Sequence, residues 1–150
     1  MTPKRSAIFA VRDDASKAAQ LFADKGYSII YLTARRRSLQ AVIPGWLKRN
    51  GFPEGNLQVK QKSDSDNHAT YKKSVLEKFQ KKGWNLFAAY GDKSTDFDAY
   101  STAGIDKNRV FALLAVGKKS CEPGIWAKCL TSWTEHLDQI AEIAQPQIDE

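Results

Sequence analysis

The sequence predicts an α/β domain with a mainly parallel sheet covered by helices on both faces. Short apolar segments alternate with amphipathic segments along the 150 residues, as strands joined by crossover helices do. Glycines follow several helical segments, at the position where a chain commonly leaves a helix. Polar residues follow the strand segments at once, so a doubly wound sheet would gather them at one edge.

Composition indicates a globular chain that favours anionic partners. Hydrophobic residues make up 42% and charged residues 27%, which is ordinary for a soluble domain. The net charge of +6 favours phosphate, acidic lipid headgroups, nucleic acid or a phosphorylated metabolite. No apolar run approaches the ~20 residues of a membrane-spanning helix. The apolar N-terminal run is too short for a signal peptide, and 150 residues fit one domain without repeats.

The first third of the chain contains two predicted strands around a helix. Residues 7–11 are apolar and form either a short strand or a buried connector. Asp13 or Asp14 can cap the helix that follows, which runs to Gly26 with alanines and Phe22 at helical spacing. Residues 27–32 are aromatic and β-branched, so they predict a strand.

The middle of the chain is predicted to hold two helices and a weak strand. Residues 38–50 have helical spacing, which Pro44 breaks or restarts because proline lacks the backbone N–H. Residues 57–60 form a weak strand, and residues 62–69 a polar linker. Thr70 can cap a helix that continues to about residue 82.

The last part alternates in the same way and ends in an extension. Residues 84–90 and 109–115 predict buried strands, with a short helix over 95–102 between them. Residues 132–135 (SWTE) match a capping box that opens a helix to about residue 144. We treat residues 117–150 as a C-terminal extension of one domain, 1–150.

Two carboxylates follow the strand over residues 84–90. Asp92 and Asp96 lie four residues apart, so both can face one pocket if a helix begins near Ser94. Hard oxygen ligands at a strand end suit Mg²⁺. The alternative is structural: Asp92 as a turn residue, and Asp96 as a first-turn carboxylate favoured by the helix dipole.

Two further polar groups lie at neighbouring element ends. Thr33 and Arg35 follow the strand over 27–32, where a hydroxyl and exposed backbone N–H groups can hold a phosphate. Lys72 lies near the start of a helix and offers a point charge. Each has a structural alternative: a turn cap for Thr33, and solvated basic surface for Arg35 and Lys72.

The order of these groups resembles a known family. Residues 31–35 (YLTAR), 71–76 (YKKSVL) and 88–96 (AAYGDKSTD) resemble motifs II, III and IV of the haloacid-dehalogenase (HAD) superfamily. More narrowly, residues 11–116 resemble the LNS2 domain of lipin phosphatidate phosphatases and membrane-associated phosphatidylinositol-transfer proteins. The resemblance implies a HAD-like (Rossmannoid) three-layer fold.

The resemblance also implies roles for single residues. Thr33 would bind the phosphoryl group, and Lys72, with Lys73 as the fallback, would steady the phosphorylated nucleophile. Asp92 and Asp96 would hold Mg²⁺. The implied activity is a Mg²⁺-dependent phosphatase acting on phosphatidate or another phosphomonoester.

The nucleophile motif of that superfamily, DxDxT, is absent from the sequence. The nearest acidic pair, Asp13-Asp14, precedes a helix. Covalent phosphoryl transfer then has no acceptor, so we expect an inactive domain that is truncated or has lost the motif. The first central strand is expected to be missing or replaced. Residues 8–11 can fill its place, the flanking strands can pair directly, or a second molecule can supply an edge.

Two other functions remain open. A non-catalytic module could bind phosphatidate or another anionic phosphate through Thr33, Arg35 and Lys72. Nucleic-acid binding rests on net charge alone, and the dispersed basic residues match no recognised motif, so we expect no specific nucleic acid.

The extension carries two cysteines. Cys121 and Cys129 are expected as free thiols in a reducing, cytoplasmic setting; a disulfide between them would instead suggest export. Trp126 and Trp133 are expected to pack over the core. His68 is expected as a solvated loop residue and His136 as a helix-surface residue.

Overall fold

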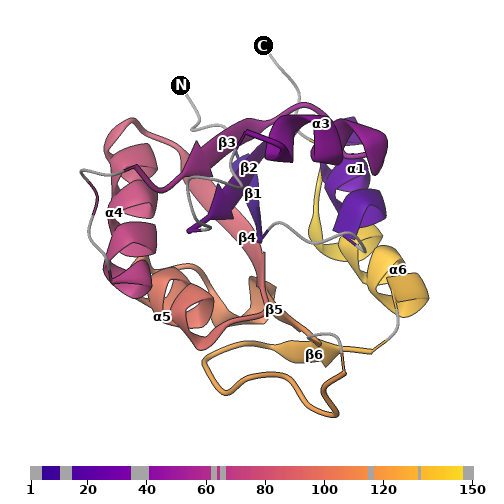
Figure 1. The fold of residues 1–150 in the computed structure, drawn as a ribbon. Helices are drawn as coiled ribbons and strands as arrows, with labels where there is room; N and C mark the ends of the chain where they lie inside the picture. The colour runs from indigo at the N-terminus through magenta and orange to yellow at the C-terminus, as the bar shows by residue number, and fades with distance from the viewer. Residues whose placement is uncertain are drawn as a thin grey trace.

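A parallel sheet runs through the described part of the chain. The structure, a computed structural model, describes residues 5–10, 15–34, 41–61, 64, 67–114, 117–131 and 133–146. Six strands pair in the order β3-β2-β1-β4-β5-β6, and every pairing is parallel. Helices cover both faces, as Figure 1 shows. The α/β fold and the parallel sheet predicted from the sequence are confirmed.

The strands and helices have the following bounds. The strands are β1 (Arg5–Ala10), β2 (Ser28–Thr33), β3 (Asn56–Val59), β4 (Asn85–Gly91), β5 (Val110–Leu113) and β6 (Lys128–Leu130). The helices are α1 (Ser16–Asp24), α3 (Ile43–Arg49), α4 (His68–Lys81), α5 (Ser94–Thr102) and α6 (Trp133–Ile143), with a 3₁₀ turn over Lys107–Arg109. Among the described helices, none has the length and apolar character needed to cross a membrane.

The central position of the sheet is filled by β1. This strand pairs with β2 on one side, Ile8 opposite Ile30, and with β4 on the other, Ile8 opposite Ala89. A strand of this chain therefore occupies the central place, as in the first of the three arrangements that we considered, although β1 covers Arg5–Ala10 where residues 8–11 were expected. Since the β1 backbone groups find partners on both sides, the sheet has no gap that a second molecule must fill.

The two faces of β1 point into two separate cores. Ala7 and Phe9 pack with side chains of α1, α3 and α6, whereas Ile8 packs with α4 and α5. Successive residues of a strand point to opposite faces, so an apolar strand such as residues 7–10 supplies both cores. This explains why that segment lacks the apolar–polar alternation of an edge strand.

Several local expectations need correction. Asn67, not Thr70, caps α4: its side-chain oxygen accepts from the Thr70 N–H at 3.0 Å. Both residue types cap helices, and the one three residues earlier is used. Of the helix expected over 38–50, the structure shows α3, Ile43–Arg49. Pro44 lies in its first turn, where a backbone N–H would have no partner within the helix. Asp13 and Asp14 lie outside the described residues, as does Ser132.

The C-terminal region departs furthest from expectation. It contributes a sixth strand, β6, which pairs with β5 and was not predicted because three residues give too little pattern. Cys121 and Cys129 form a disulfide, with Cα atoms 5.9 Å apart, so the expected free thiols are wrong. Trp126 lies against Phe97, with ring centroids 6.5 Å apart.

His136 is buried, not on the helix surface as predicted. It is 1% exposed, and its Nε2 is hydrogen-bonded to the Tyr90 hydroxyl at 2.5 Å. Its Nδ1 contacts the Gln139 Oε1 at 3.2 Å, which accepts if Nδ1 carries the proton. Burial lowers the pKa of His136 to about 4, and Lys128 adds to this effect. The imidazole is therefore neutral in the folded protein at neutral pH.

We predict that stability falls as the pH drops from 6.5 towards 4. In this window the unfolded chain protonates His136 and the folded chain does not. The free energy of unfolding therefore falls by up to about 3 kcal/mol. Urea unfolding at several pH values measures this. His136→Gln should flatten the dependence, whereas His68→Gln, at an exposed residue, should leave it unchanged. The same slope in wild type and His136→Gln would contradict the assignment.

Candidate functional site

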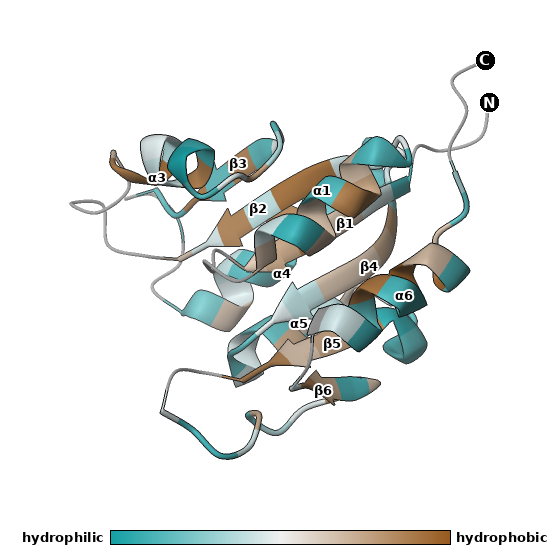
Figure 2. Cartoon of the chain, turned by 90° about the vertical axis from the view of Figure 1, so that its right-hand side faces the viewer, coloured by the Kyte–Doolittle hydropathy of each residue, from teal (hydrophilic) through white to brown (hydrophobic). Residues whose placement is uncertain are grey.

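A cavity of about 470 Å³ opens at the carboxyl edge of the sheet. The strands β2 and β4 both point to this edge, as their arrowheads show in Figure 2. Ligands of open parallel α/β sheets bind at such edges, outside the carboxyl ends of the strands. The lining residues are Ala10, Leu32, Thr33, Ala34, His68, Lys72, Asp92, Lys93, Ser94, Thr95, Asp96 and Glu122.

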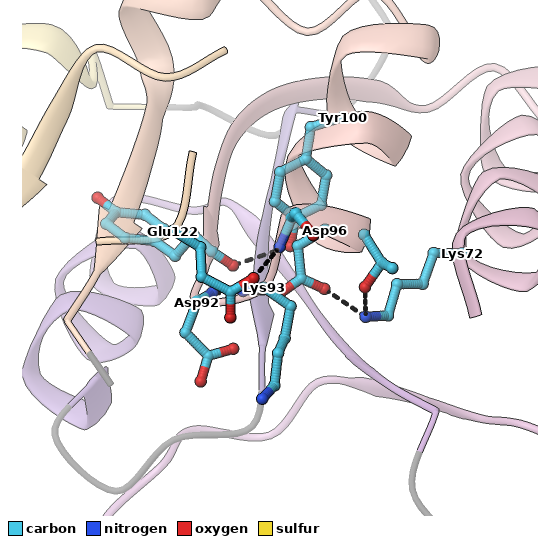
Figure 3. Close-up of polar contacts among 9 residues, drawn as sticks. Lys72, Asp92, Lys93, Asp96, Tyr100 and Glu122 are labelled. Carbon is cyan, nitrogen blue, oxygen red and sulfur yellow. Dashed lines mark hydrogen bonds and ion pairs between the residues drawn. The ribbon is translucent and has the colours of Figure 1, made fainter. Parts of the chain in front are cut away.

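Lys72 is the buried cation of this cavity. Its side chain is 7% exposed, and its Nζ lies 2.8 Å from Asp96 Oδ1 and donates to Thr95 Oγ1 at 2.9 Å (Figure 3). The solvated alternative is therefore wrong for Lys72. It does hold for Lys73, which is half-exposed and pairs with the exposed Asp98. The chain thus separates two adjacent lysines, one in the cavity and one on the surface.

Asp96 organises the loop between β4 and α5. While Oδ1 contacts Lys72, Oδ2 accepts from the backbone N–H groups of Asp92 at 3.2 Å and Lys93 at 3.1 Å. Gly91 is required by this packing, since a Cβ there would lie 2.6 Å from the Asp96 Cβ. The carboxylate thus ties the strand end, the loop and α4 together.

Burial sets the electrostatics of Asp96. It raises the pKa of this carboxyl, an effect that Lys72 and the Lys93 N–H oppose and Asp92 reinforces. A lone buried carboxylate would be costly, so the ion pair and the two backbone donors are what make a charged group tolerable here. Any group that draws Lys72 away leaves this charge undercompensated.

Thr33 and Asp92 lie on the cavity wall at the ends of β2 and β4. Thr33 is 6% exposed and Asp92 is half-buried, and both line the cavity with Lys72. The structure therefore brings together Thr33, Lys72, Asp92 and Asp96, four of the five side chains expected at the site. The fifth, Arg35, lies outside the described residues.

The end of β1 reaches the same cavity without a carboxylate. Its last residue, Ala10, lines the wall beside Thr33 and Asp92. A parallel sheet places the end of its central strand between those of its neighbours, so a nucleophile on β1 would belong here. Among the described residues β1 offers only a methyl group at that place.

The described residues make a poor Mg²⁺ site. Both Asp96 oxygens already accept from donors, one of them a cation, so binding a metal through Asp96 would break these contacts. Glu122 also accepts from a donor, the Ser94 N–H, and Asp92 is the third acidic residue of the described lining. Within the described ranges, no group of three or more histidine, cysteine or acidic side chains could hold a metal ion.

Sequence reasoning missed several lining residues. His68, the first residue of α4, is exposed and lines the cavity, rather than lying in a loop. Lys93 and Ser94 come from the β4–α5 loop and the start of α5, a position next to the predicted carboxylates that could have been inferred. Glu122 comes from the C-terminal extension, and no local pattern indicates its contact.

Known proteins resemble this chain in sequence and in fold. Residues 4–114 match the family described as PITM 1-3, LNS2 domain. Protein retinal degeneration B of Drosophila melanogaster is 30% identical over 112 residues, which is 73% of this chain and 9% of that protein. The core domain of a candidate phosphoglycolate phosphatase from Streptococcus pneumoniae superposes with a TM-score of 0.57 at 11% identity, covering 95% of this chain and 97% of that domain.

We predict that the Lys72–Asp96 pair dominates the stability of this region. Lys72→Met leaves a buried carboxylate without its cation and should cost about 3–5 kcal/mol. Adding Asp96→Asn removes the orphaned charge and should recover part of that loss. Denaturant unfolding of both single variants and the double variant gives the coupling.

The matched control is the neighbouring pair, Lys73 and Asp98, which joins the same two helices at the surface. Lys73→Met should cost less than about 1 kcal/mol, since exposed pairs contribute little. Equal losses for Lys72→Met and Lys73→Met would contradict the role given to burial.

Proposed function

The chain belongs to the LNS2 domain family of the PITM 1-3 type, a HAD-like family related to phosphatases, and we propose that it binds a phosphate monoester without hydrolysing it. The binding site in this proposal is the cavity at the carboxyl edge of the sheet. The chain covers 9% of the curated relative that it matches, so this proposal concerns the domain alone.

The observation that carries the proposal is the buried Lys72 beside the end of β1, which has no carboxylate among the residues that the structure describes. Lys72 shares the cavity with the Thr33 hydroxyl, and Ala10 stands at the end of β1. An ammonium has three donors, and two are directed to Asp96 and Thr95. The third can be offered to a phosphate oxygen, with Thr33 as a further polar partner, and Arg35 is proposed to assist.

Charges of both signs line the cavity: the lysines are Lys72 and Lys93, and the carboxylates are those of Asp92, Asp96 and Glu122, so an anion must be held by the lysine donors against these carboxylates. Lys72 is already paired with Asp96, so the local charge is close to balanced before a ligand binds. Lys93 adds a second cation at the wall, and the whole chain carries a net charge of +6. Overall positive charge raises the local concentration of anions and their rate of association.

Hydrolysis by the HAD mechanism would lack its covalent step, the transfer of the phosphoryl group to an aspartate. HAD-type transfer needs an aspartate to accept the phosphoryl group, and the sequence contains no DxDxT. Without an activated nucleophile, positioning and charge stabilisation can bind the phosphate but cannot complete the transfer. HAD phosphatases generally use Mg²⁺, but the described lining makes a poor Mg²⁺ site, because both Asp96 oxygens already accept from donors.

The second candidate is Mg²⁺-dependent hydrolysis of a phosphomonoester. It is favoured by the HAD-like fold and by the place of Asp92 on the cavity wall at the end of β4. The ligand itself could be the headgroup of phosphatidate or a soluble phosphomonoester, because both present the same dianionic phosphate. Experiments must therefore separate hydrolysis from binding, and a lipid from a soluble source.

We predict saturable binding of inorganic phosphate by calorimetry, weakened at least tenfold by Lys72→Met. Thr33→Val should weaken binding roughly three- to tenfold, the cost of a hydrogen bond to a charged group. Lys73→Met should bind like wild type. Flotation with vesicles containing phosphatidate, compared with vesicles of equal charge made with phosphatidylserine, tests the lipid source.

Release of inorganic phosphate from phosphatidate and an aryl phosphate, with Mg²⁺ present, should stay at the background rate. Release that Asp92→Asn abolishes would establish the hydrolytic function instead. Unsaturable phosphate binding that is insensitive to Lys72→Met would overturn both functions.

A further inference from the structure

Glu122 is an internal anion at the wall of the cavity. It comes from the segment between β5 and β6, and its Oε1 accepts from the backbone N–H of Ser94 at 3.0 Å (Figure 3). Ser94 is the first residue of α5, where a backbone N–H has no partner within the helix. Both residues line the cavity, so this donor faces the proposed phosphate site with a carboxylate already on it.

The chain holds Glu122 in this position from both sides. On one side, Cys121 is bonded to Cys129 of β6, which fixes the residue next to Glu122 to the edge of the sheet. On the other, the Trp126 indole N–H donates to the Glu122 carbonyl at 3.0 Å. The turn between them packs closely on α5, because a Cβ at Gly124 would lie 2.7 Å from Phe97.

We propose that Glu122 is a built-in competitor for the phosphate and that the Cys121–Cys129 disulfide keeps it in the cavity. The proposal rests on the proposed function of the cavity and adds its regulation. A phosphate that enters meets the Ser94 N–H already occupied and, beside it, the negative charge of Glu122. Cleaving the disulfide frees the segment that carries Glu122 and opens the site to the anion.

The physical reason is direct competition between two acceptors for one donor, reinforced by repulsion. A carboxylate and a phosphate dianion within one cavity of this size repel each other. The N–H groups at a helix N-terminus bind anions. Of the two anions that compete for the Ser94 N–H, the one that loses less conformational freedom on binding is favoured. Glu122 has this advantage because an eight-residue separation between bonded cysteines restricts where its backbone can move.

The redox step is a two-electron exchange. A dithiol reductant attacks one sulfur, the Cys121–Cys129 bond breaks, and the second reductant thiol resolves the mixed disulfide. The protein gains two protons and two electrons as two thiols, while the reductant leaves as its own disulfide. No other co-reactant is needed.

The test compares phosphate binding by wild type, Glu122→Gln and Glu142→Gln, all oxidised. Glu122→Gln removes the charge from the wall and should bind inorganic phosphate roughly three- to tenfold more tightly. Glu142→Gln removes the same charge from an exposed position on α6 and should match wild type. Circular dichroism confirms that each variant is folded.

The redox arm compares oxidised wild type, wild type in dithiothreitol, and the double variant Cys121→Ser/Cys129→Ser. The last two should bind phosphate more tightly than oxidised wild type. They should also show faster hydrogen exchange at the Ser94 amide, because Glu122 leaves it. Lys72→Met in the reduced background should lose the gained affinity.

The outcomes are distinct. Equal phosphate affinity in wild type and Glu122→Gln, both saturable, overturns the competitor and leaves the proposed function standing. Tighter binding by Glu122→Gln without any effect of reduction retains the competitor and overturns the role of the disulfide. Failure of every variant to bind phosphate overturns the proposed function, and this inference with it.

Discussion

The contact between Lys72 and Asp96 is the constraint on which this end of the molecule depends. It joins α4 to the start of α5, and through the second oxygen of Asp96 it fixes the loop that leaves β4. Neither charge could be buried without the other. The pair therefore defines the cavity wall, sets the path of the loop that carries Asp92, and forces the residue at the strand end to be glycine.

The same pair redistributes the roles expected of the acidic residues. In the sequence, Asp92 and Asp96 follow the same strand, four residues apart, and no neighbouring residue distinguishes their roles. In the fold, the two oxygens of Asp96 contact Lys72 and the backbone of the β4–α5 loop, whereas Asp92 lies on the cavity wall. An ion or phosphate in the cavity would therefore meet Lys72 and Asp92 first. The end of β1, with Ala10, offers it no carboxylate among the described residues.

Much of this arrangement was predictable because it follows from strand ends. Thr33, Lys72 and Asp92 lie at the ends of elements that a parallel sheet must bring together, and the order of the strands then brings them close. A strand over residues 8–11 in the central place was one of three alternatives, and β1 takes that place over Arg5–Ala10. The apolar residues 7–10 fit this place, since a strand buried on both faces needs no alternation.

The features that were not predicted from the sequence also have physical explanations. His136 lies four residues before the buried Ile140 on α6, so counting along the helix face would have placed it inside. Thr70 was expected to cap α4, whereas the cap is Asn67, three residues earlier; residue type does not separate the two, because both types cap helices. In contrast, neither β6 nor the contact between Glu122 and Ser94 leaves a local pattern. Both depend on how the C-terminal segment returns to the sheet, which only tertiary packing decides.

The most direct test of the central claim is a crystal structure of the chain grown with inorganic phosphate, compared with the same crystals of Lys72→Met. We expect a phosphate in the cavity within hydrogen-bonding distance of Lys72 Nζ and the Thr33 hydroxyl, and we expect it to be absent from the crystals of the variant. A phosphate bound elsewhere, or bound equally well in both crystals, would contradict the assignment of this cavity as the functional site.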